Sequence, residues 1–492
     1  MSQESTQTGT DRAKGSTDRR SFLAGLAAVS GTAAASQGAQ AAGWGRWGRG
    51  TRTNVIMMIP DGSSRAHDTA ARYLRAYRDD PDAYPENIPD VELAVDRADA
   101  NGYMSHFPAD PNSMVTDSAA AGTAIATGAK TYNGAISVDT DREPLPTILE
   151  RAGEAGYATG LVSTTQLTHA TPASFAAHVE DRGMQEEIAR QFVDETDVDV
   201  FLGGDRSHFR ADDRDDGEDL IGRAEEQNYA YVETASELES VSEGKVLGLF
   251  SQSGHLDYYL DRANDADNTQ PGLRQMTERA IDLLETRSDE GFFLLVEGGR
   301  IDHASHGNDP ATVPEQLEFD RALDAAMEYA RDGPRRSETL TVSASDHDTG
   351  DLGLDYGANV AAIDDLEASQ GTLTSAIDAA SSTSKIASVL ESQAGIDDLT
   401  DDELAALEED PSALTGADGI LNDRAGLVWG SGSHTGEDVP IYAAGEHAEQ
   451  FTGSIDNTDL FEVFAGVLDL DGSRRPGRST GRGRARGRDR GR

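Results

Sequence analysis

Several apolar runs in this sequence end at a residue that can bind a metal ion. Asp61 follows NVIMMIP, Glu297 closes FFLLVE, and Asp346 and His347 follow LTVSAS. In an open α/β sheet, ligands bind beside the carboxyl ends of the strands, so residues at those ends can meet there. Carboxylate and imidazole groups are ligands for divalent cations. The pattern therefore predicts a metal site at one edge of a sheet.

Ser118 precedes a run of small residues, AAAGTAIATGAK, that favours a helix. A serine at a helix start is usually a cap. The same position also directs backbone N–H groups and the positive end of the helix toward an anion such as phosphate. A divalent cation nearby would lower the pKa of the hydroxyl. Ser118 is therefore a candidate nucleophile that needs no histidine base.

Two further segments contribute histidines. In VEGGRIDHASHGND, Asp302 and His306 lie four residues apart and share one helical face, whereas His303 lies off that face. GSGSHTG places His434 in a glycine-flanked loop before a strand. The chain contains no cysteine, which excludes disulfides, thiolate zinc sites and a cysteine nucleophile. The metal ligands must therefore be His and carboxylate side chains.

The elements that carry these residues alternate between apolar runs and amphipathic stretches. The apolar runs are NVIMMIP, ATGLVSTT, VDVFLGG, KVLGLFS, FFLLVEG, LTVSASD and VPIYAAG. Continuous apolar strands separated by helices are typical of a parallel or mixed sheet that is covered on both faces. We therefore predict an α/β fold with a central, mostly parallel β-sheet flanked by helices on both faces. The acidic, strand-poor segment at about 350–430 is predicted to be a peripheral insertion.

The two ends of the chain differ from this pattern. Residues 1–42 contain Arg19 and Arg20 before a short apolar stretch, and AQA before Ala42 offers a small-residue cleavage site. This region resembles a twin-arginine signal peptide, and its apolar stretch is too short and too weakly hydrophobic for a stable membrane span. We expect the catalytic domain at 43–472. An Arg/Gly-rich tail at 473–492 is expected to be disordered.

The charge balance is strongly acidic. The formal net charge is -47 and the sequence pI is about 4.4, which argues against nucleic acid as a specific partner and would repel anionic membranes. Lysine occurs only at positions 14, 130, 245 and 385, so arginine carries almost all the positive charge. This composition suits molar salt, where the Debye length falls to about 3 Å and repulsion between carboxylates is screened.

Several motifs in the sequence resemble those of one enzyme family. TDSAAAGTAIATGAKTYNG, THATPASFAAHVEDR, VEGGRIDHASH, SDH and SHTG occur in the order found in alkaline phosphatases. The resemblance runs from Asn54 to about Val467 and is poor in the acidic insertion. It implies hydrolysis of phosphate monoesters through a phosphoserine, and a homodimer. With the leader and the charge, it suggests an exported, halophilic archaeal-type member that scavenges extracellular phosphate in high salt.

The resemblance also implies a role for each motif residue. Ser118 would be phosphorylated, Arg182 would bind two phosphate oxygens, and Asp117 would hold Arg182 by an ion pair. The implied ligands of two zinc ions are Asp302, His306 and His434 for the first, and Asp61, Asp346 and His347 for the second. Two such ions about 4 Å apart stabilise the attacking and leaving oxygens of an in-line displacement. Small phosphomonoesters are the expected substrates, and inorganic phosphate is the expected product inhibitor.

A third metal site is implied next to the second. It would share Asp61 and add Thr171 and Glu297, and oxygen ligands of this kind favour Mg²⁺. His169 stands where the enteric-bacterial pattern has Asp, and His303 stands where that pattern has Lys. Imidazole at the third site also invites Zn²⁺, Mn²⁺ or Co²⁺.

Two other functions compete with this interpretation. A phosphodiesterase of the same superfamily would share the two-zinc core but lack a phosphate clamp, and Arg182 in its motif argues for monoesters. A non-catalytic, cation-binding surface protein would use its carboxylates only as a salt coat. That second alternative gives no special role to Ser118 or Arg182.

Salt dependence follows from the acidic composition. Lowering the salt concentration from molar to near zero should unfold the protein, because unscreened carboxylates repel one another. The measurement is circular dichroism across a salt series at constant temperature. A signal that stays flat over the whole series would contradict salt adaptation.

Overall fold

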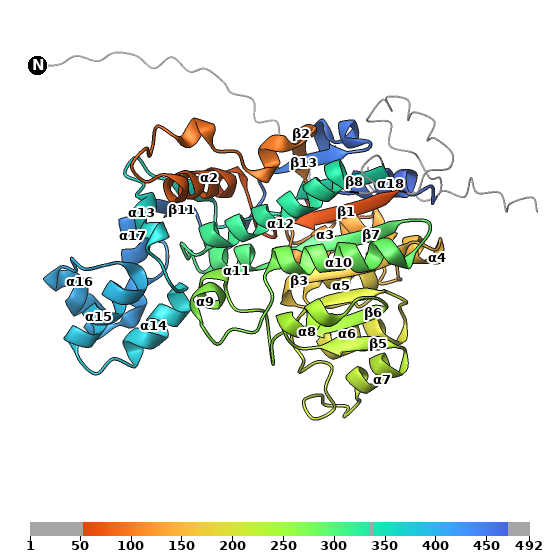
Figure 1. The fold of residues 1–492 in the computed structure, drawn as a ribbon, viewed down its shortest axis with the longest axis horizontal. Helices are drawn as coiled ribbons and strands as arrows, with labels where there is room; N and C mark the ends of the chain where they lie inside the picture. Colours follow the sequence, from red (N-terminus) through yellow and green to blue (C-terminus); the bar gives the residue numbers. More distant parts are fainter. Residues whose placement is uncertain (1–52, 334–337, 471–492) are drawn as a thin grey trace, which may run out of the picture. The chain divides into compact units, whose positions relative to one another are not determined.

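A ten-stranded sheet lies at the centre of the part of the chain that the structure describes, residues 53–333 and 338–470 of a computed structural model (Figure 1). In spatial order its strands are β14 (Gly453–Asp456), β2 (Ala100–Ser105), β13 (Val439–Gly445), β8 (Thr339–Ala344), β1 (Asn54–Ile59), β7 (Phe292–Glu297), β3 (Ala158–Gln166), β4 (Val200–Gly204), β6 (Lys245–Leu249) and β5 (Tyr229–Val232). Every residue of β1, β7 and β8 is buried, as expected for strands covered on both faces.

The predicted fold class is confirmed, and one strand runs against the rest. β13 pairs antiparallel with both β2 and β8, whereas the other pairings within the ten-stranded sheet are parallel. The apolar run VPIYAAG marks β13 as a strand, but its direction depends on partners that are distant in sequence. The four neighbouring strands β8, β1, β7 and β3 are mutually parallel, so their carboxyl ends lie at one edge.

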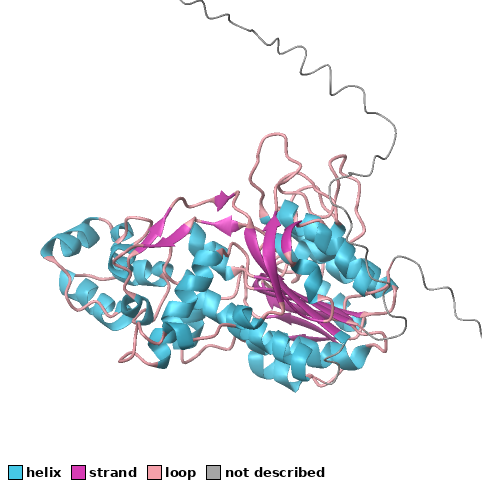
Figure 2. Ribbon diagram, turned by 90° about the horizontal axis from the view of Figure 1, so that it is seen from above, coloured by secondary structure: helices cyan, strands magenta, loops and turns pink. Residues whose placement is uncertain are grey.

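Helices cover both faces of the sheet (Figure 2). One face packs against α10 (Leu273–Arg287) and α12 (Thr312–Asp332), with α2 (Arg65–Asp79) lying on α12. The other face carries α3 (Ser118–Thr127), α4 (Ile148–Glu154), α5 (Ala170–Ala176) and α18 (Asp459–Val467). The remaining helices around the sheet are α6 (Gln185–Asp194), α7 (Leu220–Glu226), α8 (Ala235–Ser240), α9 (Tyr259–Asn264) and α11 (Arg300–His306), with short 3₁₀ turns at η1 (Ile88–Asp90), η2 (Ala94–Arg97) and η5 (Ala448–Phe451).

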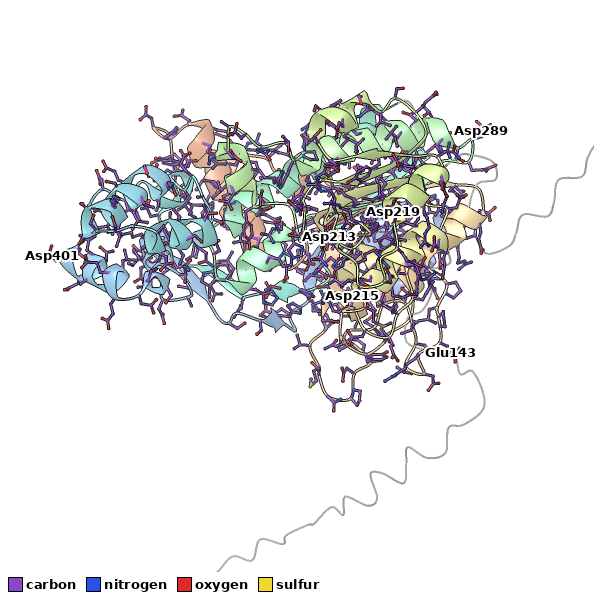
Figure 3. The ribbon with its side chains drawn as sticks, turned by 90° about the horizontal axis from the view of Figure 1, so that it is seen from below. Glu143, Asp213, Asp215, Asp219, Asp289 and Asp401 are labelled. Carbon is purple, nitrogen blue, oxygen red and sulfur yellow. The ribbon has the colours of Figure 1, made fainter. Side chains whose placement is uncertain are left out.

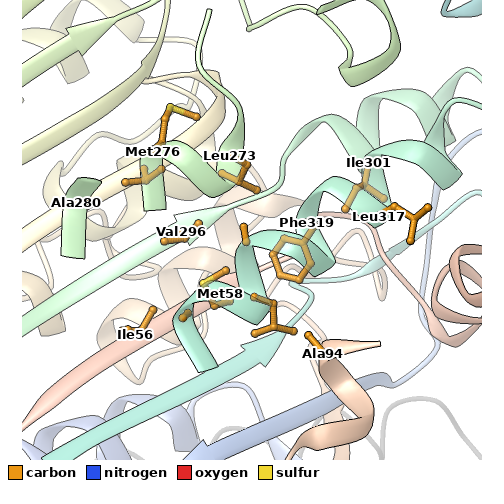
Figure 4. Packing of buried hydrophobic residues seen from close by; sticks show 14 of the residues in the cluster. Ile56, Met58, Ala94, Leu273, Met276, Ala280, Val296, Ile301, Leu317 and Phe319 are labelled. Atoms are coloured by element: carbon orange, nitrogen blue, oxygen red, sulfur yellow. The ribbon is translucent and has the colours of Figure 1, made fainter. Parts of the chain in front are cut away.

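The main core lies between the sheet and the α10–α12 layer (Figure 4). Met58 and Val296 project from neighbouring strands toward Met276 and Phe319 of the two covering helices, and all four are fully or almost fully buried. Burying such side chains contributes roughly 1.5–3 kcal/mol each. This packing fixes the strands whose ends carry the predicted metal ligands.

The acidic segment at about 350–430 has its own small core. It contains α13 (Val360–Asp364), α14 (Gln370–Asp378), α15 (Thr383–Ala394), α16 (Asp401–Glu409), η4 (Pro411–Leu414) and α17 (Ile420–Ala425). Leu373, Ile386 and Leu390 form part of a second apolar cluster there. A two-stranded ladder of β10 (Leu352–Leu354) and β11 (Leu427–Trp429) joins the two ends of the segment. A second ladder, β9 (Asp348–Thr349) with β12 (His434–Thr435), lies beside the metal-ligand edge of the sheet.

The surface carries many exposed carboxylates, and Figure 3 labels six of them, three of which lie in the segment between β4 and α7: Glu143, Asp213, Asp215, Asp219, Asp289 and Asp401. The predicted signal peptide at 1–42 and the tail at 473–492 lie outside the described residues. Within 53–333 and 338–470, no helix has the length and apolarity needed to cross a membrane.

One buried carboxylate on α12 makes a testable contribution to stability. Burial raises the pKa of Asp320 to about 7, and its Oδ1 accepts a hydrogen bond from the Ala94 backbone N–H at 2.7 Å. Since the folded state holds this proton more tightly than the unfolded state, stability is lost as the pH rises from about 4 to about 7. Asp320→Asn should therefore stabilise the protein by about 1–2 kcal/mol at pH 8 and have little effect at pH 4.

Urea unfolding at constant high salt, at both pH values, checks this expectation. Asp289→Asn, at an exposed position, is the matched control and should change neither value. An Asp320→Asn effect of the same size at both pH values would show that Asp320 does not titrate in this window.

Candidate active site

The carboxyl ends of the four central strands bring the predicted acidic ligands together. Glu297 is the last residue of β7 and lies opposite Ile59 of β1 in the ladder. Asp61 follows β1 by two residues, and Asp346 follows β8 by two. All three side chains are fully buried, and they come from adjacent parallel strands. The sheet order therefore places three carboxylates in one buried cluster.

Ser118 is the first residue of α3, and Asp117 is its N-cap. The Asp117 carboxylate accepts from the Ala120 backbone N–H at 2.9 Å, so the serine side chain is not needed as the cap. The Oγ of Ser118 lies 3.2 Å from Nε2 of His347, and the serine is almost fully buried. The small residues of α3 allow close packing on α5, because a Cβ at Gly122 would lie 2.9 Å from Oγ of Ser174. This close packing fixes the helix start, and with it Ser118.

Helix α11 and the β9–β12 ladder supply the histidine-rich part of the site. Asp302 and His306 share one face of α11, with 3.4 Å between the carboxylate and Nε2. His434 pairs with Thr349 in the ladder, which brings its Nε2 to 3.6 Å from Asp302. The turn after β1 approaches α11 closely, since Gly62 has φ +73° and a Cβ there would lie 2.8 Å from the Cα of Asp302. That contact requires glycine in the IPDGSS segment.

Backbone carbonyls fix the proton positions of two of these histidines. Nδ1 of His434 lies 2.9 Å from the carbonyl of Thr116, and Nδ1 of His306 lies 2.9 Å from the carbonyl of Gly432. A carbonyl only accepts, so each neutral ring carries its proton on Nδ1 and has its lone pair on Nε2. The two Nε2 atoms lie 3.0 Å apart, next to the Asp302 carboxylate. Two facing lone pairs beside a carboxylate are stabilised by a shared cation.

His347 is oriented in the same way. The Thr349 hydroxyl donates to Asp302 at 2.6 Å, so it accepts from Nδ1–H of His347 at 3.3 Å. Nε2 of His347 therefore carries a lone pair, which lies 3.4 Å from Asp346 and 3.7 Å from Asp61. It also accepts from the Ser118 hydroxyl. A cation bound to this histidine and the two carboxylates would lie beside the candidate nucleophile.

Crowding of the buried carboxylates opposes their ionisation. Burial, and then the charges of Asp346, Asp302 and Glu297, raise the pKa of Asp61 well above its usual value. Burial, with the nearby charge of Asp302, raises the pKa of Asp346 to about 7. Carboxylates in such a group are stable as anions only when a cation neutralises them.

A third group adjoins the second through Asp61. Thr171, at the start of α5, donates to Asp61 at 3.4 Å. Nδ1 of His169, the residue before α5, lies 3.8 Å from Glu297. Glu297 also accepts hydrogen bonds from the Ser163 hydroxyl and, at 3.1 Å, from the Thr165 hydroxyl. These two hydrogen bonds hold the Glu297 carboxylate in position.

The donor set fits metal ions. Ligand atoms lie within 4.8 Å of one another in three groups of residues: Asp302, His347 and His434; Asp61, Asp346 and His347; and Asp61, His169 and Glu297. The distances above add His306 to the first group. Four buried atoms in these groups have no hydrogen-bond partner among the described residues: Asp61 Oδ1, Asp346 Oδ2, His169 Nδ1 and Glu297 Oε1. Buried polar atoms normally have partners, and bound cations would supply them for the three carboxylate oxygens. The Nε2 of His169 accepts from Arg182, so in the neutral ring Nδ1 carries the proton.

Arg182 lies at the rim of the same cluster. Its Nη1 donates to Asp117 at 3.1 Å, and its Nη2 donates to Nε2 of His169 at 2.9 Å. The side chain is 30% exposed, so it can be reached from solvent. Asp117 thus connects the start of α3 to a guanidinium group that could bind an oxyanion next to Ser118.

The structure brings every predicted site residue into this one region, but sequence reasoning missed several of their neighbours. Thr349 orients His347, Ser163 orients Glu297, and His255 and Arg300 lie beside His303. Thr349 directly follows the SDHD run, and that position was only a weak indication that it belongs to the site. His255 lies in the loop after β6, where no motif or periodicity marks it.

Comparisons with known proteins agree with this geometry. The alkaline phosphatase family profile matches residues 52–470. Alkaline phosphatase 4 of Bacillus subtilis is 37% identical over 430 residues, which cover 84% of this chain and 88% of that protein. The crystal structure of Thermus thermophilus alkaline phosphatase superposes with a TM-score of 0.74 at 31% identity, covering 86% of this chain and 92% of the other.

A third relative bears on metal binding. A His-to-Asp variant of the alkaline phosphatase from the Antarctic bacterium TAB5, with Mg bound in its M3 site, is 25% identical to this chain. It covers 85% of this chain and 99% of its own, with a TM-score of 0.60. The matched length, the shared fold and the clustered acid and histidine side chains lead to one conclusion: this chain belongs to the alkaline phosphatase family of phosphomonoester hydrolases.

Proposed function

We propose that this protein hydrolyses phosphate monoesters to alcohol and inorganic phosphate through a covalent phosphoserine on Ser118. The observation that carries the proposal is the pair of Nε2 lone pairs on His306 and His434, 3.0 Å apart beside Asp302. Their orientation favours a bound cation, and the neighbouring His347 places the Ser118 hydroxyl beside a second such group. Cation sites flanking a buried serine suit phosphoryl transfer.

In the first step, the Oγ of Ser118 forms a bond to phosphorus while the ester P–O bond breaks. The serine proton passes to solvent and the departing alkoxide takes one proton from solvent water, so the alcohol forms with no net change in protons. In the second step, the oxygen of a water molecule forms a new bond to phosphorus and the bond to Oγ breaks. Ser118 regains a proton, and inorganic phosphate is released.

Arg182 binds and orients the phosphoryl group in this proposal. The guanidinium presents several N–H donors in one plane, which suits two non-bridging phosphate oxygens better than a lysine would. Asp117 holds Nη1 and His169 holds Nη2, so the group is already oriented before substrate binds. This pre-orientation reduces the entropy lost on binding.

The metal ions are proposed to be two Zn²⁺ and one Mg²⁺. Asp302, His306 and His434 would hold the first Zn²⁺, and Asp61, Asp346 and His347 the second, because imidazole with carboxylate suits zinc. Asp61, Thr171 and Glu297 would hold Mg²⁺, with His169 favouring Zn²⁺, Mn²⁺ or Co²⁺ there instead. When bound, such ions supply Lewis-acid chemistry that lowers the pKa of a hydroxyl or water and stabilises a leaving oxygen.

The setting of this activity is part of the proposal. The leader at 1–42 supports export by the twin-arginine route, and the net charge of -47 supports a salt-adapted, halophilic archaeal-type enzyme. An exported phosphomonoesterase suits phosphate scavenging outside the cell. Family resemblance supports a homodimer with a catalytic domain at 43–472.

Replacing the nucleophile tests the mechanism directly. Ser118→Ala should lower kcat for a chromogenic phosphomonoester at alkaline pH and molar salt by about 1,000-fold or more, because no phosphoserine can form. Chelation of the wild-type protein should abolish turnover, and adding Zn²⁺ back should restore it.

Ser240→Ala, on the exposed face of α8, is the control and should keep full activity. Wild-type protein that stays inert with metals present, or a Ser118→Ala protein that stays active, would sink the phosphoserine mechanism. Activity toward a phosphodiester alone would favour the diesterase instead.

Arg182 should act on binding of the phosphoryl group. Arg182→Lys loses the bidentate geometry, so both the KM for a monoester and the inhibition constant of inorganic phosphate should rise about tenfold or more. Steady-state kinetics at molar salt measures both constants. Arg142→Lys, at a surface ion pair with Glu180, is the matched control and should change neither. Unchanged constants in Arg182→Lys would remove Arg182 from the phosphate site.

A further inference from the structure

Two histidines outside the three metal-ligand groups lie beside the phosphate clamp. The rings of His255 and His303 are 4.2 Å apart, and they lie 5.7 and 5.3 Å from the ring of His169. His169 in turn accepts a hydrogen bond from Arg182. His255 comes from the loop after β6 and His303 from α11, so two distant segments form this pair.

Unambiguous donors fix the proton position of each ring. The Gln166 backbone N–H donates to Nδ1 of His255 at 3.0 Å, and the Arg300 guanidinium donates to Nδ1 of His303 at 2.9 Å. Neither donor can accept, so both neutral rings carry their proton on Nε2. This is the opposite tautomer from His306, His434 and His347.

The tautomer decides what the pair can bind. A ring whose Nδ1 lone pair is occupied and whose Nε2 bears a proton has no lone pair for a metal ion. The pair instead offers two N–H donors. Neither Nε2 has a hydrogen-bond partner among the described residues, and both side chains are half-buried and in reach of solvent.

The surroundings of the pair favour an anion. The guanidinium of Arg300 donates to His303, and the guanidinium of Arg182 donates to the neighbouring His169. Arg300 is held over the Tyr258 ring at 3.7 Å. Two guanidinium groups and two N–H donors are thus concentrated at one place on an acidic protein.

We propose that His255 and His303 form a subsite that binds a second oxyanion on the leaving group of the substrate, a carboxylate or a further phosphate. This inference deepens the proposed function and rests on it. The subsite lies one ring beyond the His169–Arg182 contact, which suits a group that is attached to the ester rather than the transferred phosphoryl group itself. It would make the enzyme prefer monoesters that carry a second negative group.

Binding of phosphonates that cannot be hydrolysed tests the subsite without turnover. Calorimetry on the metal-loaded protein at molar salt compares phenylphosphonate with 3-carboxyphenylphosphonate. The wild-type protein should bind the carboxylated compound about tenfold more tightly, as expected for hydrogen bonds to a charged group. Molar salt screens long-range charge, so the ratio reports short-range contacts.

Matched variants test whether the Nε2–H donor of His255, rather than the structural role of the side chain, determines the affinity ratio. His255→Asn keeps an oxygen that can accept from the Gln166 N–H but lacks the distal donor, so the affinity ratio should fall to about 1–2. His255→Gln places an amide N–H near the Nε2 position and should recover part of the ratio. His208→Asn, a half-buried histidine elsewhere, is the control and should leave the ratio at its wild-type value.

Turnover of phenyl phosphate and 3-carboxyphenyl phosphate separates the two proposals. If neither ester is hydrolysed but the binding ratio depends on His255, the proposed function fails and the subsite stands. If both esters are hydrolysed but the ratio is the same in wild type and His255→Asn, the subsite is overturned. Equal loss of affinity for both phosphonates in His255→Asn would also overturn it, since that result assigns His255 to supporting Arg182.

Discussion

The site depends on one physical constraint at the carboxyl ends of β8, β1, β7 and β3. Buried hydrogen-bond acceptors there exceed the donors available to them. Asp61, Asp346 and Glu297 are fully buried there, and burial with mutual repulsion raises the pKa of Asp61 and Asp346. Such an arrangement is costly in a folded protein unless cations neutralise it. The helices on both faces supply the apolar burial that keeps these strand ends in place.

Hydrogen bonds from outside the ligand groups decide what each histidine can do. Carbonyls of Thr116 and Gly432 accept from His434 and His306, which turns their lone pairs inward. Donors from Gln166 and Arg300 act on His255 and His303 in the opposite sense. The imidazoles of five histidines thus divide into rings that present a lone pair, on His306, His347 and His434, and rings that present an N–H, on His255 and His303. The division comes from the backbone and neighbouring side chains, because the five side chains are chemically identical.

The fold class and the clustering of the strand-end carboxylates and histidine could be predicted, because both depend on local pattern. Apolar runs identify strands, and parallel strands carry their carboxyl-terminal residues to one edge. The direction of β13, the β9–β12 ladder and the place of His255 depend on contacts between distant segments. No spacing rule reports such contacts. The histidine tautomers could not be predicted either, because the sequence does not show which backbone N–H, such as that of Gln166, donates to a histidine.

The acidic surface and the donor-rich site are compatible because they act over different distances. At molar salt the Debye length is about 3 Å, so the net charge of -47 repels a phosphate ester only weakly. Recognition must then come from contacts at hydrogen-bond distance. The charged guanidinium of Arg182 can make such contacts. A neutral imidazole N–H can make them without a charge that salt would screen. At that salt concentration, oriented donors at short range contribute more to binding than a positively charged funnel would, and the arginine and histidine cluster at this rim consists of such donors.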